Sequence, residues 1–371
     1  MGVSSTGSNA CIDVRGTDQD ALRAGPRFAW RGRDPMSGQD LPSIVFGPVP
    51  SRRLGRSLGI NNVLPKECTY SCVYCQLGRT HRLRSERRRQ HPPGAVIEAV
   101  QRRVRLAHQT GERIDALTFV PDGEPTLDVE LGREIQGMRS LGLRLAVISN
   151  GSLVHRQDVR QDLGVADWVS LKVDAVDEPT WRRINRPHRS LDLDTTLRGL
   201  LRFKSDFGGV LVTETMLAAG LNDDPGQLES LGDFLQDLAP ALAYLAIPTR
   251  APAERWVRPP DEGTLNRAYQ VLSRRLPRVE LLAAYEGSAF SASGRSEDDL
   301  LSITAVHPLR TEAVADLLRR NGDDWAVVDR LIRQGRLVAH RYQDEAFYLR
   351  RFRPAWADTG SEPADRSGSV L

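Results

Sequence analysis

Short apolar runs alternate with longer amphipathic stretches through most of the 371-residue chain. Each run is rich in β-branched residues and is bounded by Gly, Pro or polar positions, a pattern that predicts buried strands. The predicted strands are Leu58–Val63, Leu117–Val120, Leu145–Ile148, Trp168–Val173, Val210–Met216 and Tyr244–Ile247.

The stretches between these runs carry the spacing of helices. Val96, Ala99, Val100 and Val104, for example, lie roughly along one helical face. Strands that alternate with helices predict an α/β fold with a parallel sheet and right-handed crossovers. Six such units predict a partial (β/α)6 barrel over residues 44–294, with its chemistry at the carboxyl ends of the strands. The predicted helices are 95–109, 127–141, 156–163, 193–206, 225–238 and 261–275.

A smaller unit is predicted over residues 295–353. Thr311–Arg320 and Asp324–Gly335 predict two short helices, and Arg336–His340 with Ala346–Leu349 predicts a hairpin. Two helices followed by a hairpin resemble a winged-helix domain. At roughly 60 residues such a unit is near the lower limit for folding alone, so we expect it to pack on the barrel. Residues 1–43 and 354–371 are polar and without periodicity, which predicts flexible tails.

Composition narrows the class of protein only a little. The net charge of +3 is too small to indicate a nucleic-acid partner by itself. We see no apolar stretch near the ~18 residues that a membrane span needs, and no apolar signal-peptide core. We therefore expect a soluble, cytoplasmic protein without a membrane partner.

Three of the four cysteines stand together, Cys68, Cys72 and Cys75, in the order Cys-x3-Cys-x2-Cys. With only Cys11 besides them, the chain has too few cysteines for a disulfide scaffold. Three thiolates can bind three irons of a four-iron cluster and leave the fourth iron open, whereas fully ligated clusters normally use four cysteines. A zinc site completed by His81 is the alternative that the spacing leaves open.

Polar residues follow the second predicted strand as Gly123-Glu124-Pro125-Thr126. A glycine there allows a close approach of the backbone to a ligand, and the glutamate can accept hydrogen bonds from an ammonium group. The alternative is an ordinary turn with a solvated carboxylate, since turns that hold both Gly and Pro are common.

The next two strands end in polar residues as well. Ser149 and Asn150 can bond a ribose or a carboxylate, or simply form a polar turn. Lys172 and Asp174 share one face of the fourth strand and need partners if that face is buried, so a structural salt bridge is the alternative there. Weaker candidates at this edge are Arg183, Asn185, Arg186, Glu214, Asn222 and Asp223.

A basic run follows the cysteines. Clustered arginines can bind phosphates, but the acidic residues nearly balance the basic ones, and we favour ordinary solvated surface. The run consists of Arg79, His81, Arg82, Arg84, Arg87, Arg88, Arg89 and His91.

The cysteine loop with Tyr74 resembles that of radical S-adenosylmethionine (SAM) enzymes, and 123–126 looks like their second-strand motif for the methionine amino group. The resemblance is greater to one branch, the radical SAM proteins similar to the tRNA wyosine-base (4-demethylwyosine) synthases. It covers about residues 46–260, in the segments 46–55, 57–60, 72–78, 123–126, 149–152, 172–175 and 184–187.

This resemblance implies a mechanism and a set of site residues. Cys68, Cys72 and Cys75 would hold a [4Fe-4S] cluster whose open iron binds SAM. An electron from a donor such as flavodoxin or ferredoxin would then release a 5′-deoxyadenosyl radical, which takes hydrogen from a substrate. Tyr74 would pack near adenine. The amino group would lie at Gly123, Glu124, Pro125 and Thr126, and the ribose or carboxylate at Ser149, Asn150, Lys172 and Asp174.

The chain departs from the wyosine-base synthases in one respect. Those enzymes bind a second cluster through further cysteines near the N-terminus, and here Cys11 stands alone. The substrate is therefore left unidentified. Modification of RNA, tRNA in particular, is the alternative function, and a non-enzymatic winged-helix regulator that carries a cluster or zinc is a more distant one.

Overall fold

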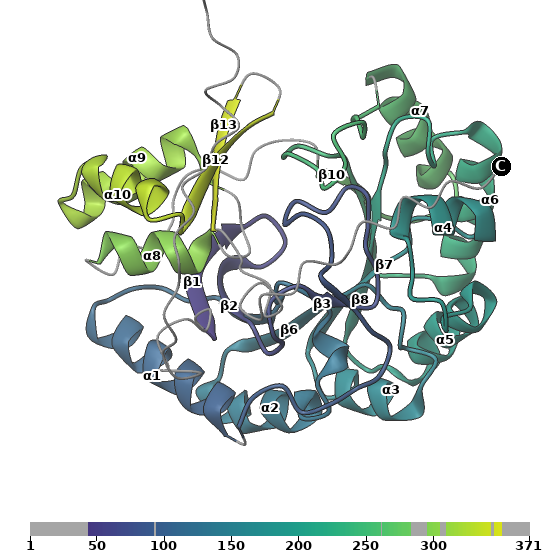
Figure 1. The fold of residues 1–371 in the computed structure, drawn as a ribbon. Helices are drawn as coiled ribbons and strands as arrows, with labels where there is room; N and C mark the ends of the chain where they lie inside the picture. The colour runs from purple at the N-terminus through teal and green to yellow at the C-terminus, as the bar shows by residue number, and fades with distance from the viewer. Residues whose placement is uncertain are drawn as a thin grey trace, which may run out of the picture. The chain divides into compact units, whose positions relative to one another are not determined.

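The computed structural model describes residues 44–92, 94–260, 262–282, 295–304, 309–342 and 345–350 (Figure 1). The two predicted tails, including Cys11, lie outside the described residues.

The main sheet is an open α/β sheet with the strand order β1-β2-β5-β6-β7-β8-β9-β10. Neighbouring strands from β2 to β10 are parallel, and β1 is antiparallel to β2 at the edge. The strands are β1 Val45–Ser51, β2 Gly55–Ile60, β5 Ala116–Phe119, β6 Arg144–Ser149, β7 Trp168–Lys172, β8 Val210–Met216, β9 Leu242–Ala246 and β10 Val279–Leu282.

Helices connect the parallel strands, as the alternating pattern predicts. The six predicted strands and six predicted helices are confirmed, while β1, β10 and α4 were not predicted. The helices are α1 Ala95–Gln109, α2 Leu131–Met138, α3 Gln157–Leu163, α4 Glu178–Asn185, α5 Leu193–Asp206, α6 Pro225–Leu238 and α7 Glu262–Ser273, with 3₁₀ turns η2 Pro125–Leu127 and η3 Arg139–Leu141.

The two faces of the sheet have separate cores. One large cluster joins strand residues such as Leu117 and Val169 to the helices. On the other face, Leu54 from the β1–β2 turn packs in one cluster with Trp168, Val212 and residues of β5, β6 and β9. This cluster lies on the concave face of the sheet, which is curled as a half-barrel. Of the described residues, none belongs to a helix that is both long and apolar enough to span a membrane.

The last described elements form a smaller three-stranded sheet with the order β11-β13-β12 and three helices. They have their own buried cluster, which includes Leu300, Leu317 and Leu331, and Val49 of β1 packs against it. The elements are α8 Ser296–Ile303, β11 Leu309–Arg310, α9 Thr311–Asn321, α10 Ala326–Arg333, β12 Leu337–Tyr342 and β13 Glu345–Arg350.

The cysteine loop is hydrogen-bonded to the segment that follows the carboxyl end of β5. Its two short strands are β3 Glu67–Cys68 and β4 Arg82–Leu83. Glu67 forms an isolated bridge with Gly123, and the Glu124 amide donates to the Glu67 carbonyl over 3.0 Å. A Cβ atom on Gly123 would lie 2.0 Å from that carbonyl oxygen. The close approach expected for a ligand at Gly123 is thus made by the backbone of the cysteine loop.

We predict that Gly123→Ala displaces the cysteine loop and lowers the free energy of unfolding by about 1–3 kcal/mol, because the added methyl group meets backbone that cannot rotate away. Urea unfolding of the purified chain measures this. Gly208→Ala is the matched control, since a Cβ atom there meets nothing within 4 Å. Equal unfolding midpoints for the two variants would contradict the prediction.

Candidate functional site

Cys68, Cys72 and Cys75 are free thiols of intermediate exposure on the loop after β2. The segment around them is held by backbone hydrogen bonds to two distant parts of the chain. The Val73 amide donates to the Ile184 carbonyl of α4 over 2.9 Å, and the Glu254 amide donates to the Val73 carbonyl over 3.0 Å. The cysteine positions therefore depend on α4 and on the segment after β9, as well as on β5.

Each cysteine sulfur has a side-chain N–H group near it, and these three groups come from different elements. Asn150 Nδ2, after β6, lies 3.5 Å from Cys68 Sγ, and Asn185 Nδ2, in α4, lies 3.5 Å from Cys72 Sγ. Lys66 Nζ, just before β3, lies 3.9 Å from Cys75 Sγ. Donors aimed at ligand sulfurs are typical of the surroundings of metal sites. Lys66 was not a sequence candidate, although it stands two positions before the first cysteine.

The residues present fit a four-iron cluster better than a single metal ion. Among the described residues, no three His, Cys, Asp or Glu side chains are grouped as ligands of one ion, and this includes the cysteines with His81. Thiolates of a four-iron cluster bind different irons and need not converge on one point. Without metal, burial raises the pKa of Cys68 and raises that of Cys72 to about 12.

Glu124 is the centre of a buried polar group beside Cys68. Its Oε1 accepts from the Thr126 amide and hydroxyl, at 3.1 and 2.6 Å, and from the Ser149 hydroxyl at 2.7 Å. Its Oε2 accepts from the Asn150 amide at 2.8 Å. A carboxylate has about four acceptor positions, two on each oxygen, so Oε1 is fully used and Oε2 keeps one. Burial raises the pKa of Glu124, and these donors oppose the rise.

Tyr74, Asp174 and Asn185 form a second group, beside Cys72. The Tyr74 hydroxyl donates to Asp174, as does Asn185 Nδ2 over 2.7 Å. The other oxygen of Asp174 accepts from the Met216 amide over 2.8 Å. This network joins the cysteine loop to the ends of β7 and β8. Asn185, a weak candidate in the sequence, thus contacts both Cys72 and Asp174.

Lys172 is paired with Glu214 on the neighbouring strand, with Nζ 2.8 Å from Oε1, and not with Asp174. Arg53, from the β1–β2 turn, pairs with the other oxygen of Glu214. Burial acts to raise the pKa of Glu214, but the two cations outweigh burial and lower it to about 2. Lys172 Nζ also lies 5.1 Å from the centre of the Tyr74 ring. The salt bridge left open by the sequence is therefore present, with a different carboxylate.

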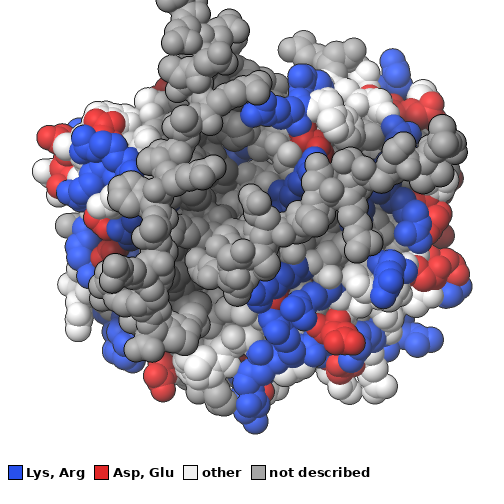
Figure 2. Space-filling model, viewed as in Figure 1, with Lys and Arg blue, Asp and Glu red and all other residues white. Residues whose placement is uncertain are grey.

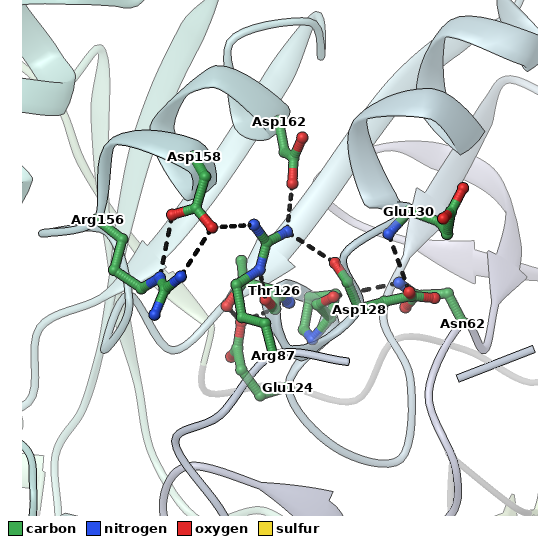
Figure 3. A network of polar contacts seen from close by, with 10 residues as sticks. Asn62, Arg87, Glu124, Thr126, Asp128, Glu130, Arg156, Asp158 and Asp162 are labelled. Atoms are coloured by element: carbon green, nitrogen blue, oxygen red, sulfur yellow. Dashed lines mark hydrogen bonds and ion pairs between the residues drawn. The ribbon is translucent and has the colours of Figure 1, made fainter. Parts of the chain in front are cut away.

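Much of the basic run is paired inside the chain. Arg87 is nearly buried, and it bonds Asp158 over 2.8 Å, Asp162, and the Asp128 carbonyl over 2.7 Å (Figure 3). The fully buried Glu67 receives three arginines, and Glu254 and Glu130 pair with two more. Those five are Arg82, Arg84, Arg88, Arg79 and Arg89.

Three half-exposed arginines around the single carboxylate of Glu67 still leave an excess of positive charge at this surface. Figure 2 shows Lys and Arg side chains gathered below the centre of the visible face. Internal ion pairs thus account for much of the basic run, and the choice between ordinary surface and a phosphate site stays a prediction.

Residues 63–230 match the profile of the Radical SAM superfamily. A UPF0026 protein of Methanocaldococcus jannaschii is 39% identical over 313 residues, which are 84% of this chain and 97% of the relative. A UPF0026 protein of Helicobacter pylori, strain J99, is 31% identical over 304 residues, 77% of this chain and 91% of the relative.

Among solved structures, a radical SAM methyltransferase from Sphaerobacter thermophilus has a TM-score of 0.48 at 16% identity, over 62% of this chain and 67% of that one. The match to the superfamily profile includes the three cysteines and the ends of β5 to β7, where the candidate residues lie. The chain therefore belongs to the UPF0026 family and is a member of the radical SAM superfamily, whose members are enzymes that use a [4Fe-4S] cluster and SAM.

Proposed function

We propose that this protein cleaves SAM reductively and uses the resulting 5′-deoxyadenosyl radical to take a hydrogen atom from a substrate. The observation that carries the proposal is the arrangement of three cysteine sulfurs, each with its own N–H donor, at the carboxyl ends of parallel strands. Flavodoxin and ferredoxin are the classes of donor that we expect to deliver the electron, one at a time.

The chain's own residues would hold and orient the reactants. Cys68, Cys72 and Cys75 would ligate the cluster, which supplies the electron that breaks the S–C5′ bond of SAM. The acceptor position left on Glu124 Oε2 suits the SAM amino group. Asp174 is already bonded to Tyr74 and Asn185, so we assign it to holding the Tyr74 ring in place for adenine.

By contrast, the Ser149 hydroxyl and the Asn150 amide groups already form hydrogen bonds within the chain. Ser149 donates to Glu124, and Asn150 donates from its amide to Glu124 and from its side chain to Cys68 and Thr69. Ser149 and Asn150 thus position the Glu124 carboxylate and the cysteine loop. A SAM ribose or carboxylate bound by Ser149, Asn150 or Lys172 would share their polar groups with these partners inside the chain.

We propose that residues 295–353 form a winged-helix-like domain that recognises the substrate. The element order α8-β11-α9-α10-β12-β13 supports this, since two helices lead into a hairpin and β11 joins the hairpin as a third strand. The separate buried cluster of this segment and the contact of Val49 with it support a small domain packed on the barrel edge.

A polyanionic substrate such as tRNA is the second candidate, and the excess of arginine around Glu67 is the observation in its favour. Against it stands the internal pairing of Arg79, Arg87 and Arg89. A non-enzymatic regulator is set aside, because members of the radical SAM superfamily are enzymes.

Protein purified without oxygen, reconstituted with iron and sulfide, and given SAM with a strong reductant should form 5′-deoxyadenosine. Cys72→Ala should lose this product, because two thiolates do not hold the cluster in place. Chromatography of the quenched reaction measures the product.

The control for that assay is Cys11→Ala, which leaves the three-cysteine loop intact and should keep the parent yield. Product that forms equally with Cys72→Ala, or protein isolated with zinc in place of iron, would overturn the proposal.

The second prediction separates the two substrate classes. If the substrate is not RNA, tRNA should bind weakly at physiological salt and with little change in affinity between Arg84→Gln and the parent. If tRNA is the substrate, log Kd should rise linearly with log salt, and Arg84→Gln should lessen that slope by about 1. Gel-shift titrations at several salt concentrations decide between these outcomes. Arg139→Gln is the matched control, since this half-exposed arginine and its partner Asp167 lie at the amino ends of β6 and β7, opposite the cysteine loop.

A further inference from the structure

Lys66 is a buried cation at the cysteine loop, in a position that neither the motif nor the comparisons assign to anything. Its side chain is 3% exposed. Its Nζ donates to the Gly78 carbonyl over 2.8 Å and lies 3.9 Å from Cys75 Sγ. A lysine is almost never so deeply buried without a partner, so the surroundings of its charge need an account.

The charge of Lys66 is only loosely paired. Among the described residues, the one carboxylate paired with it is Asp122, whose Oδ1 lies 3.8 Å from Nζ, which is too far for a hydrogen bond. Both Asp122 oxygens are buried and lack a hydrogen-bond partner among the described residues. The Lys66 ammonium therefore lies about as close to Cys75 Sγ, at 3.9 Å, as to Asp122 Oδ1, at 3.8 Å, and its charge acts on both.

The backbone of Lys66 adds a second, independent observation. Its φ is 59°, in the left-handed region that residues with a Cβ atom rarely adopt. Backbone strain of this kind persists where surrounding structure requires it, and it is found most often at functional sites. Here its amide donates to the Asp122 carbonyl over 2.7 Å, which holds the Lys66 backbone against the end of β5.

The other two sulfur donors are neutral amides, Asn150 and Asn185. The set of donors is therefore asymmetric, with its only positive charge at Cys75. Reduction potentials of iron–sulfur clusters depend on nearby charge, on hydrogen bonds to the sulfurs and on exclusion of solvent, and Lys66 contributes all three.

We propose that Lys66 is a positioning residue that sets the reduction potential of the cluster through Cys75. Reduction adds one negative charge to the cluster, and a buried ammonium group favours the reduced form. Lys66 thus makes the cluster easier to reduce by a biological one-electron donor. This inference rests on the proposed function, in that Cys75 must bind the cluster.

The test is the midpoint potential of the reconstituted full-length protein, followed by electron paramagnetic resonance during a redox titration. Lys66→Met removes the charge, keeps the chain length and has a similar backbone cost at positive φ. We expect its midpoint to shift to a more negative value. Lys66→Arg retains the charge and should stay close to the parent.

Asp122→Asn is the matched control, because it removes a negative charge beside Cys75 where Lys66→Met removes a positive one. Removing that carboxylate cannot make the field at Cys75 more negative, so its midpoint should equal that of the parent or shift to a more positive value. If Lys66→Met fails to hold a cluster, Lys66→Gln, which also lacks the charge but keeps a donor for the Gly78 carbonyl, is titrated in its place and should show the same negative shift.

The outcomes separate this inference from the proposed function. A parent protein that holds no four-iron cluster would contradict the proposed function itself. A parent with the cluster, but with an unchanged or more positive midpoint in Lys66→Met, would overturn only the role of Lys66. A negative shift of similar size in both Lys66→Met and Asp122→Asn would also overturn it, because loosened packing would then explain both.

Discussion

The attachment of the cysteine loop to the ends of β5 and β6 is the constraint on which the rest of the site depends. The loop backbone lies against Gly123, where no side chain fits, and the Asn150 side chain reaches Cys68 from the next strand. Short parallel strands bring these residues to one edge. The sulfur positions are therefore fixed by strand ends that belong to the rigid sheet, as a site that must hold a reactive cofactor requires.

The polar residues of this edge act first on one another. Glu124 accepts hydrogen bonds from hydroxyl and amide groups of η2 and the end of β6. Asp174 accepts hydrogen bonds from the cysteine loop, α4 and β8. Buried carboxylates need such donors, because an unsatisfied one is costly. At Glu124 one acceptor position remains, on Oε2, and it suits a ligand that carries hydrogen-bond donors.

The periodicity of the sequence was enough to predict the central strands and most helices, because a buried parallel strand and an amphipathic helix have distinct spacings. It did not predict β1, whose run Val45–Ser51 is interrupted by Gly47, Pro48 and Pro50, nor β10, which is only four residues long. The helix α4 is short, and most of its residues are polar or charged, so its apolar face did not stand out.

The candidate site could be predicted as a set of positions, but not as a set of contacts. Motif order placed Tyr74, Glu124 and Asp174 at one edge, whereas the partner of Lys172 and the neighbour of Gly123 depend on how distant segments pack. Lys66 was missed for the same reason, since a single lysine before a cysteine carries no signal until the fold buries it.

The proposed chemistry requires that the three cysteines hold a four-iron cluster with one iron open to SAM. Mössbauer spectroscopy of the iron-57 protein, with and without SAM, tests it most directly. We expect four irons per chain, of which one changes its Mössbauer parameters when SAM is added. Four irons that all remain unchanged on addition of SAM, or a cluster with no distinct iron, would contradict it.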